Sequence, residues 1–131
     1  MSPNLTLVLS YIAFIWIVIL HTFEEISCDI MDLELGHIKL TKNRYLLGAS
    51  IISTLNLGTL VLLTLNLPAG YYLGLFTSSI FGIFQALVHT TGYIREGKKS
   101  RGFGAGFFSS IPLAVIGIIV LIQLIQAISS F

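Results

Sequence analysis

A histidine and two adjacent glutamates lie near the end of the first apolar stretch of the chain, within the sequence ILHTFEEISCDIMD at residues 19–32. His21, Glu24 and Glu25 are spaced at i, i+3 and i+4, so their side chains share one face of a helix. A histidine and a carboxylate one turn apart can bind a divalent metal or exchange protons with a substrate. The spacing therefore marks a candidate catalytic site.

A second histidine, His89, lies near the end of a later apolar stretch. At 1.5 Å per residue, a helix from residue 5 reaches His21 after roughly 24 Å, and a helix from residue 71 reaches His89 after roughly 27 Å. The two histidines are therefore predicted at similar depth, where they can meet. Small residues at four-residue spacing permit close helix contact, and such a stripe predicts that His89 faces inward. The stripe comprises Gly74, Ser78, Gly82, Gln85, His89 and Tyr93.

Two histidines and one glutamate would form a metal site with room left for water. We predict His21, Glu24 and His89 as ligands of a divalent metal, which would be zinc, iron or manganese. Glu25 would then take a proton from the bound water or from the substrate. Tyr93 could donate a proton to an oxyanion, and the alternative is that it anchors the helix at the membrane interface.

Two amide side chains are expected to form a secondary pocket. Gln85 lies one turn before His89, and Asn56 falls near the middle of its apolar stretch. A lone amide at that depth usually finds a partner inside a helix bundle. We therefore expect both side chains to face the interior.

A simpler interpretation gives the charged residues no chemical role. Glu24 and Glu25 would mark the membrane interface and pair with Arg44 or Arg95, while the two histidines bond to the backbone or to each other. Ionisable groups inside membranes are costly and usually functional. A second histidine at matched depth therefore favours a functional site.

The composition is that of a membrane protein. Of the 131 residues, 55% are hydrophobic and 10% are charged, and the mean hydropathy is +0.93. Residues 1–23, 45–94 and 102–131 contain no Asp, Glu, Lys or Arg. A membrane-spanning helix needs about 20 apolar residues, so the outer stretches hold one span each and the middle stretch, divided at Pro68, holds two. We predict an all-α polytopic integral membrane protein, with one transmembrane domain over residues 1–131. The predicted four-helix bundle has helices at roughly residues 5–27, 45–66, 71–94 and 103–128.

The basic residues predict the orientation in the membrane. With four spans, the first and third loops lie on the same side, and they carry Lys39, Lys42, Arg44, Arg95, Lys98, Lys99 and Arg101. The positive-inside rule places that side in the cytoplasm. We therefore expect a protein of the plasma (inner) membrane with both termini outside. The net charge is only +1, so nucleic-acid binding has no support.

The remaining polar residues of the first helix and loop have simpler expectations. The first span lacks a basic start and a cleavage site, so we expect it to be retained. Cys28 is the single cysteine, which excludes an internal disulfide, and it is either a small helix residue or a metal ligand. Asp29, Asp32 and Glu34 are expected in a solvated loop. His37 belongs to the same loop, either as an exposed side chain or as part of a lid.

Three motifs resemble those of the HXXEE-domain proteins, small integral membrane proteins regarded as candidate enzymes. HTFEE at residues 21–25 matches the HxxEE motif, and QALVH at 85–89 is similar to the family's Asn-Ala-x-x-His. SRGFGA at 100–105 resembles a glycine-containing third motif, although the usual proline is absent and Ala105 replaces a hydroxyl residue. The resemblance covers nearly the whole chain. It implies a functional set that comprises His21, Glu24, Glu25 and His89.

These features favour an enzyme that acts on a lipophilic small molecule from the bilayer, because little protein lies outside the membrane to bind a soluble substrate. Metal-assisted or His/Glu acid–base catalysis would carry out a hydrolysis, an isomerisation or a cyclisation. One alternative is an ion or proton transporter in which the same side chains form a relay. Another is a structural membrane subunit. The small-residue helix faces would also allow a homo-oligomer.

Overall fold

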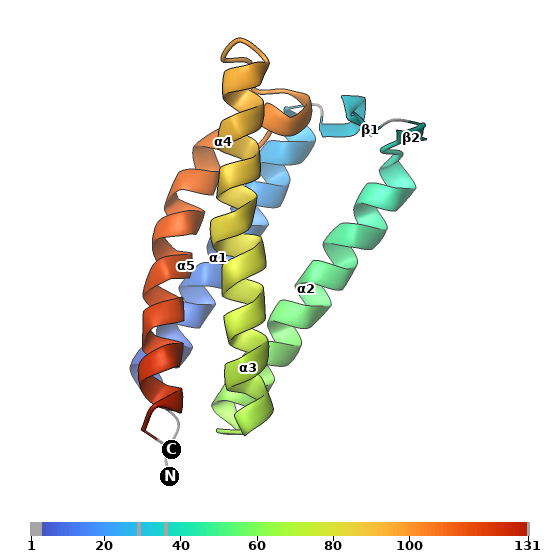
Figure 1. Cartoon of the computed structure of the whole chain (residues 1–131). Coiled ribbons are helices and arrows are strands. Elements are labelled where there is room, and N and C mark those ends of the chain that lie inside the picture. Colours follow the sequence, from blue (N-terminus) through green and yellow to red (C-terminus); the bar gives the residue numbers. More distant parts are fainter. Residues whose placement is uncertain (1–3, 29, 36, 131) are drawn as a thin grey trace.

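The protein is a bundle of four long helical rods, described here from a computed structural model that covers residues 4–28, 30–35 and 37–130. The first two rods are single helices, α1 (Leu5–Ser27) and α2 (Lys42–Thr64). The third rod is continuous through α3 (Pro68–Thr77), the π-helix η2 (Ser78–Phe84) and α4 (Gln85–Arg95). The last rod is α5 (Phe107–Ile128). Figure 1 shows the rods side by side.

All four rods, of 23, 23, 28 and 22 residues, are long and apolar enough to cross a membrane. The prediction of an all-α four-helix membrane bundle is therefore confirmed. Strands are confined, in the described residues, to a two-residue pair, β1 (Glu34–Leu35) and β2 (Ile38–Lys39), which follows the short 3₁₀-helix η1 (Ile30–Asp32).

Three of the four rods begin at residues other than those expected. The third rod begins at Pro68 rather than residue 71, because proline is well suited to the first position of a helix. α2 begins at Lys42, three residues early, because the Thr41 side chain accepts a hydrogen bond from the Arg44 amide and caps the helix. α5 begins at Phe107 rather than residue 103. A 3₁₀ turn, η3 (Gly102–Gly104), occupies that place, and Gly106 at φ +81° is left-handed, which an α-helix does not accommodate.

The connections α1–α2 and α4–α5 lie at one end of the bundle, which we call the loop end (Figure 1). The start of α1, the end of α5 and the α2–α3 turn lie at the other end, the turn end. From the turn end, α2 diverges from the third rod toward the loop end. The bundle is therefore closed at one end and spread at the other.

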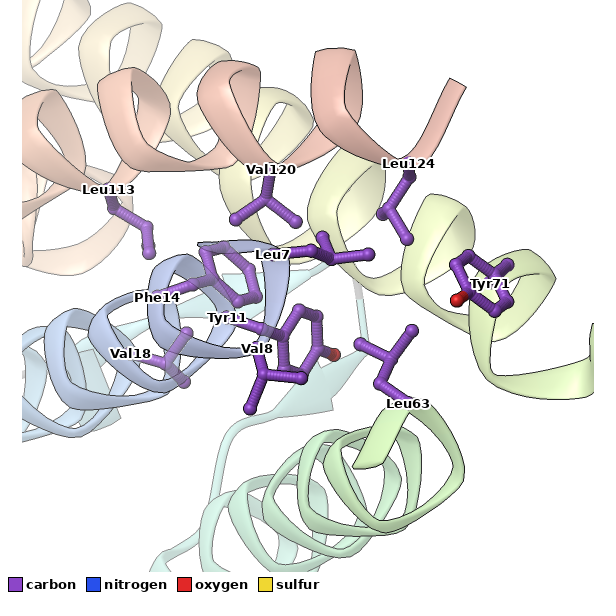
Figure 2. Packing of buried hydrophobic residues seen from close by; sticks show 10 residues of the cluster. All are labelled: Leu7, Val8, Tyr11, Phe14, Val18, Leu63, Tyr71, Leu113, Val120 and Leu124. Carbon is purple, nitrogen blue, oxygen red and sulfur yellow. The ribbon is translucent and has the colours of Figure 1, made fainter. Parts of the chain in front are cut away.

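The core fills the closed half. Figure 2 shows side chains of α1 directed at α5, α3 and the end of α2. Tyr11 is fully buried there, and its hydroxyl donates to Asn56 (2.9 Å) and lies 2.7 Å from the Thr77 hydroxyl. In lipid, such packing and interhelical hydrogen bonds replace the hydrophobic effect as the force that joins helices. The core cluster comprises Leu7, Val8, Tyr11, Phe14, Val18, Leu63, Tyr71, Leu113, Val120 and Leu124.

Glycines allow three rods to meet at one point. A Cβ built on Gly82 of η2 would lie 3.2 Å from the Gly117 Cα of α5 and 3.2 Å from the Phe14 ring of α1. The predicted small-residue stripe of the third rod is thus used inside the bundle, where Gly74, Ser78 and Gly82 are all buried. A homo-oligomer remains a prediction, but these three residues are not available to form it.

We predict that Gly82→Leu destabilises the fold by about 1–3 kcal/mol, because overpacking at this contact forces the rods apart. Gly58→Leu is the matched control, since a Cβ there meets nothing within 4 Å and the residue is exposed on α2. Thermal unfolding in detergent measures both variants. Equal unfolding temperatures for the two variants would contradict the close packing at Gly82.

Candidate metal site

Two histidines and one glutamate from the first and third rods converge near the loop end. Nε2 of His21 lies 3.2 Å from Nε2 of His89, and Oε1 of Glu25 lies 3.7 Å from the former and 3.2 Å from the latter. All three residues are buried: His21 is 2% exposed, His89 4% and Glu25 8%. The predicted meeting of the two histidines is therefore found, and the group could hold a metal ion.

The separations match those of metal ligands. With ligand bonds of about 2.0–2.1 Å, the edge of a tetrahedral site is roughly 3.3–3.4 Å. The three observed separations, 3.2, 3.2 and 3.7 Å, lie close to that edge without rearrangement of the backbone. Three protein ligands would leave a fourth position open.

Each of the three groups is held on its far side by a different part of the chain. Nδ1 of His89 donates to the carbonyl oxygen of Phe103 (2.9 Å), and Nδ1 of His21 lies 2.9 Å from the Ser109 hydroxyl. The Tyr45 hydroxyl donates to Oε2 of Glu25 (2.9 Å). Outer hydrogen bonds of this kind fix the tautomer and orientation of metal ligands.

The hydrogen bond from His89 to Phe103 has a chemical consequence. A carbonyl only accepts, so Nδ1 of His89 carries the proton, and the lone pair of a neutral His89 Nε2 faces Glu25 Oε1 and His21 Nε2. A carboxylate oxygen and an imidazole lone pair repel at 3.2 Å unless positive charge lies between them. The centre of this cluster is therefore suited to a metal ion or a proton.

Gln85 joins the cluster, as predicted for the secondary pocket. Its side-chain nitrogen lies 2.9 Å from His21 Nε2, 3.4 Å from His89 Nε2 and 3.5 Å from Glu25 Oε1. If the Gln85 amide were flipped by 180°, its oxygen would take the place of its nitrogen and could serve as a fourth metal ligand. This arrangement places one amide within reach of all three groups.

The glutamate that lies with the two histidines is Glu25, and not Glu24 as predicted. Glu24 turns away from the histidines, and its two carboxylate oxygens accept from the backbone amides of Phe108 (3.1 Å) and Ser109 (2.7 Å). A carboxylate at a helix N-terminus is stabilised by the free amides and the helix dipole. Glu24 therefore ties α1 to the start of α5 and is not free to act as the second glutamate of the site.

Asn56 and Tyr93 also lie outside the cluster. Asn56 is buried with Tyr11 and Thr77 in the closed half of the bundle, and Tyr11 precedes His21 by ten residues, roughly 15 Å along α1. Tyr93 stacks on Phe107 with ring centroids 4.1 Å apart. Tyr93 therefore makes an aromatic contact with Phe107 and does not lie beside the histidines.

The interpretation that gives the charged residues no chemical role agrees with the structure in part. The histidines do bond to each other and to the backbone, but Glu25 pairs with the histidines and Tyr45 rather than with Arg44 or Arg95. The Arg44 guanidinium instead donates to the Lys39 carbonyl oxygen. No charge from the basic loops thus neutralises Glu25 within the described residues.

The loop after α1 holds the other polar residues of the first motif. Glu34 is exposed and lies 3.9 Å from the Lys39 ammonium, and His37 is exposed. Asp29 lies outside the described residues, and the side chain of Asp32 does too. Cys28 is half-buried, and the structure does not place it with the metal-ligating group. The prediction of a solvated loop is met for Glu34 and His37.

Sequence reasoning missed Tyr45, Ser109 and Phe103. Tyr45 stands at the loop-end start of the second apolar stretch, the same level as Glu25, and that depth could have identified it. Ser109 lies at the corresponding level of the last helix. Phe103 contributes a backbone carbonyl, for which the residue type gives no signal.

A cleft leads from the cluster to the gap between α2 and the third rod. A cavity of about 350 Å³ has Glu25, Gln85 and His89 at one end, and an adjoining cavity of about 190 Å³ reaches His21 and Tyr45. We call the two together the side cleft. Its lining residues include members of α2 and of the third rod, the two rods that diverge toward the loop end in Figure 1. Its apolar wall includes Ile52, Ile80, Phe81, Phe84 and Val88.

We predict that Gly106→Ala disrupts the site by more than its backbone cost. A Cβ on Gly106 would lie 2.6 Å from the His21 ring and 3.0 Å from Glu25 Cγ, and the positive φ adds about 1–2 kcal/mol. Gly97→Ala, at φ +68° with nothing within 4 Å, carries the backbone cost alone. Urea unfolding should show the larger loss for Gly106→Ala, and equal losses would contradict the contact with His21.

Comparison with known proteins adds no family to this geometry. The chain matches no protein-family model, and neither a curated protein nor a solved structure matches it. The resemblance to the HXXEE-domain proteins therefore stays a prediction that rests on its motif residues.

Proposed function

We propose that the protein is a membrane-embedded, metal-dependent enzyme that acts on a lipophilic small molecule. The observation that carries the proposal is the buried convergence of His21, Glu25 and His89 at the end of an apolar cleft. A catalytic metal centre characteristically has three protein ligands and one open position. Here the open position would face a cleft that surrounding lipid can reach.

The protein groups divide the chemistry among them. A bound metal would polarise a substrate oxygen or provide hydroxide from water. Glu25 Oε1 faces the histidines, while Oε2 accepts a hydrogen bond from the Tyr45 hydroxyl, so the carboxylate could pass a proton between the two sides of the site. Tyr45 lines the cleft, and its hydroxyl would donate to a developing oxyanion by turning its one proton away from Glu25. Of the three reactions considered, hydrolysis uses this arrangement most directly.

The orientation belongs to the same proposal. All seven basic residues lie in the two connections at the loop end or beside them, so the positive-inside rule places the site near the cytoplasmic face. The membrane would be the plasma (inner) membrane, with both termini outside. A substrate would then enter sideways from the bilayer and its product could leave toward the cytoplasm.

Ion or proton transport is the second candidate, since a relay would need buried polar groups beyond the metal site. A second buried polar group, formed by Tyr11, Asn56 and Thr77, lies on the turn-end side of the metal site. These side chains are satisfied by one another and packed within the core, which favours a structural role over a path. Zinc or proton flux into vesicles that contain the protein would support transport instead.

We predict that the purified protein binds about one equivalent of zinc, iron or manganese. Glu25→Gln and His89→Ala should each lower the affinity by about a hundredfold or more, since loss of an outer partner alone can cost 10–100-fold. Elemental analysis and metal titration measure the effect.

Three variants serve as controls for the metal experiment. Glu24→Gln should retain the metal because Glu24 binds the α5 amides. Glu34→Gln and His37→Ala change exposed loop residues and should bind as the wild type does. Loss of metal in Glu24→Gln but not in Glu25→Gln would reverse the assignment of the ligand. If the wild type takes up no stoichiometric metal, acid–base catalysis by the same residues remains.

We predict that a photoactivatable fatty acid in the bilayer labels the wall of the side cleft. Ile52→Trp should remove most of this labelling, because Ile52 lines both parts of the cleft. Ile51→Trp is the control, since its neighbour Ile51 is 52% exposed on the outer face of α2. Mass spectrometry of labelled peptides locates the adducts. Labelling that both variants retain would exclude entry between α2 and the third rod.

A further inference from the structure

A third cavity lies outside the candidate metal site, on the outer face of α4. Its volume is about 560 Å³, and it follows one side of the helix from Phe84 to Arg95, roughly 16 Å. We call it the α4 groove. It is lined by Phe84, Leu87, Val88, Thr91, Gly92, Arg95, Glu96 and Phe103.

The groove changes character along its length. Phe84 and Leu87, toward the membrane interior, are 57% and 62% exposed and so face the surrounding lipid. Thr91 and Arg95, at the loop end, are exposed and stand one turn apart on α4. An apolar channel thus ends in a hydroxyl and a guanidinium at the level where lipid head groups lie.

Gly92 and Phe103 form the floor of the groove. A Cβ on Gly92 would collide with Phe103, so only glycine lets the segment after α4 fold back this closely. The Phe103 amide donates to Oε1 of Glu96 (3.2 Å), which holds the segment against the helix end. The glycine and the capping carboxylate therefore build the hollow beside Arg95.

The charge around the polar end is strongly positive. Residues 95–101 carry four basic residues and one acidic residue, a net charge of +3. Oε1 of Glu96, the acidic residue, accepts from the Phe103 amide, and its Oε2 is buried with no hydrogen-bond partner among the described residues, whereas Arg95, Lys98, Lys99 and Arg101 are exposed. In the described residues no ion pair involves these four side chains. They are free to meet an anion from outside the chain.

We propose that the α4 groove is a binding site for an anionic phospholipid. One acyl chain would lie along Phe84, Leu87 and Val88, and the phosphate would accept hydrogen bonds from the Arg95 guanidinium and the Thr91 hydroxyl. Arginine binds phosphate in bidentate fashion, and interfacial basic residues each attract anionic lipid by a factor of about five. The apolar wall selects a lipid over free phosphate.

The groove and the metal site share Phe103. Like Phe84 and Val88, Phe103 lines both the groove and the side cleft, and its carbonyl oxygen accepts from His89 Nδ1. A lipid in the groove would press on the residue that orients His89. The proposal itself concerns binding alone, so it does not depend on metal or catalysis.

The test compares phosphatidylglycerol, phosphatidylcholine and phosphatidylethanolamine with identical chains, titrated onto the full-length protein in detergent and counted by native mass spectrometry. Phosphatidylglycerol should bind at least about fivefold more tightly than the other two. Arg95→Gln should remove that preference, while Arg101→Gln, exposed but outside the groove, should keep most of it. Glycerol phosphate in excess should not displace the lipid.

A second pair of variants tests the groove itself without touching a charge. Leu87→Trp should fill the channel and abolish the tightly bound lipid, whereas Leu47→Trp, 63% exposed on α2, should not. Equal binding of all three lipids, or a preference that survives both Arg95→Gln and Leu87→Trp, would mean bulk lipid only and overturn the proposal. A preference for phosphatidylethanolamine would also overturn it.

Discussion

The structure depends on one electrostatic constraint, the approach of two imidazole nitrogens and a carboxylate oxygen to within 3.2–3.7 Å in a buried position. With His89 Nδ1 committed to a carbonyl, an uncompensated cluster would place acceptors face to face. Such a cluster persists only if a cation, a shared proton or the Gln85 amide lies between the acceptors and if each group is fixed from behind. Phe103, Ser109 and Tyr45 supply those fixed contacts, and they come from three different parts of the chain.

This requirement explains the glycine-rich connection between α4 and α5. The Phe103 carbonyl reaches His89 only because the segment lies directly on Gly92, where a Cβ would collide with Phe103. Gly106 then turns the chain in a left-handed conformation against the His21 ring, and Glu24 caps the helix that follows. The resemblance to a family motif at residues 100–105 marked this connection. In the structure, this connection places a backbone carbonyl, rather than a side chain, beside His89.

The sequence predicted the features that follow from helix length and rise. Counting residues from the helix starts placed His21 and His89 at the same depth, and the structure joins them. It could not choose between Glu24 and Glu25, because positions i+3 and i+4 flank the same face of α1 and only neighbouring rods decide which one turns inward. The sequence correctly predicted that Asn56 faces the interior and finds a partner there. It was wrong to group Asn56 with Gln85 in one pocket, since the inward direction of an amide says nothing about its level relative to a site. A backbone hydrogen-bond acceptor such as the Phe103 carbonyl cannot be predicted from the type of the residue.

The uneven packing of the bundle connects fold to function. Midway along the bundle, Gly82 and Gly117 let α1, the third rod and α5 touch, and nearer the turn end Tyr11 joins α1 to α2 and α3 by hydrogen bonds. At the loop end α2 diverges, and the side cleft occupies the space between α2 and the third rod (Figure 1). The closed half therefore fixes the helices that carry His21 and His89, while the spread half leaves a cavity beside Glu25.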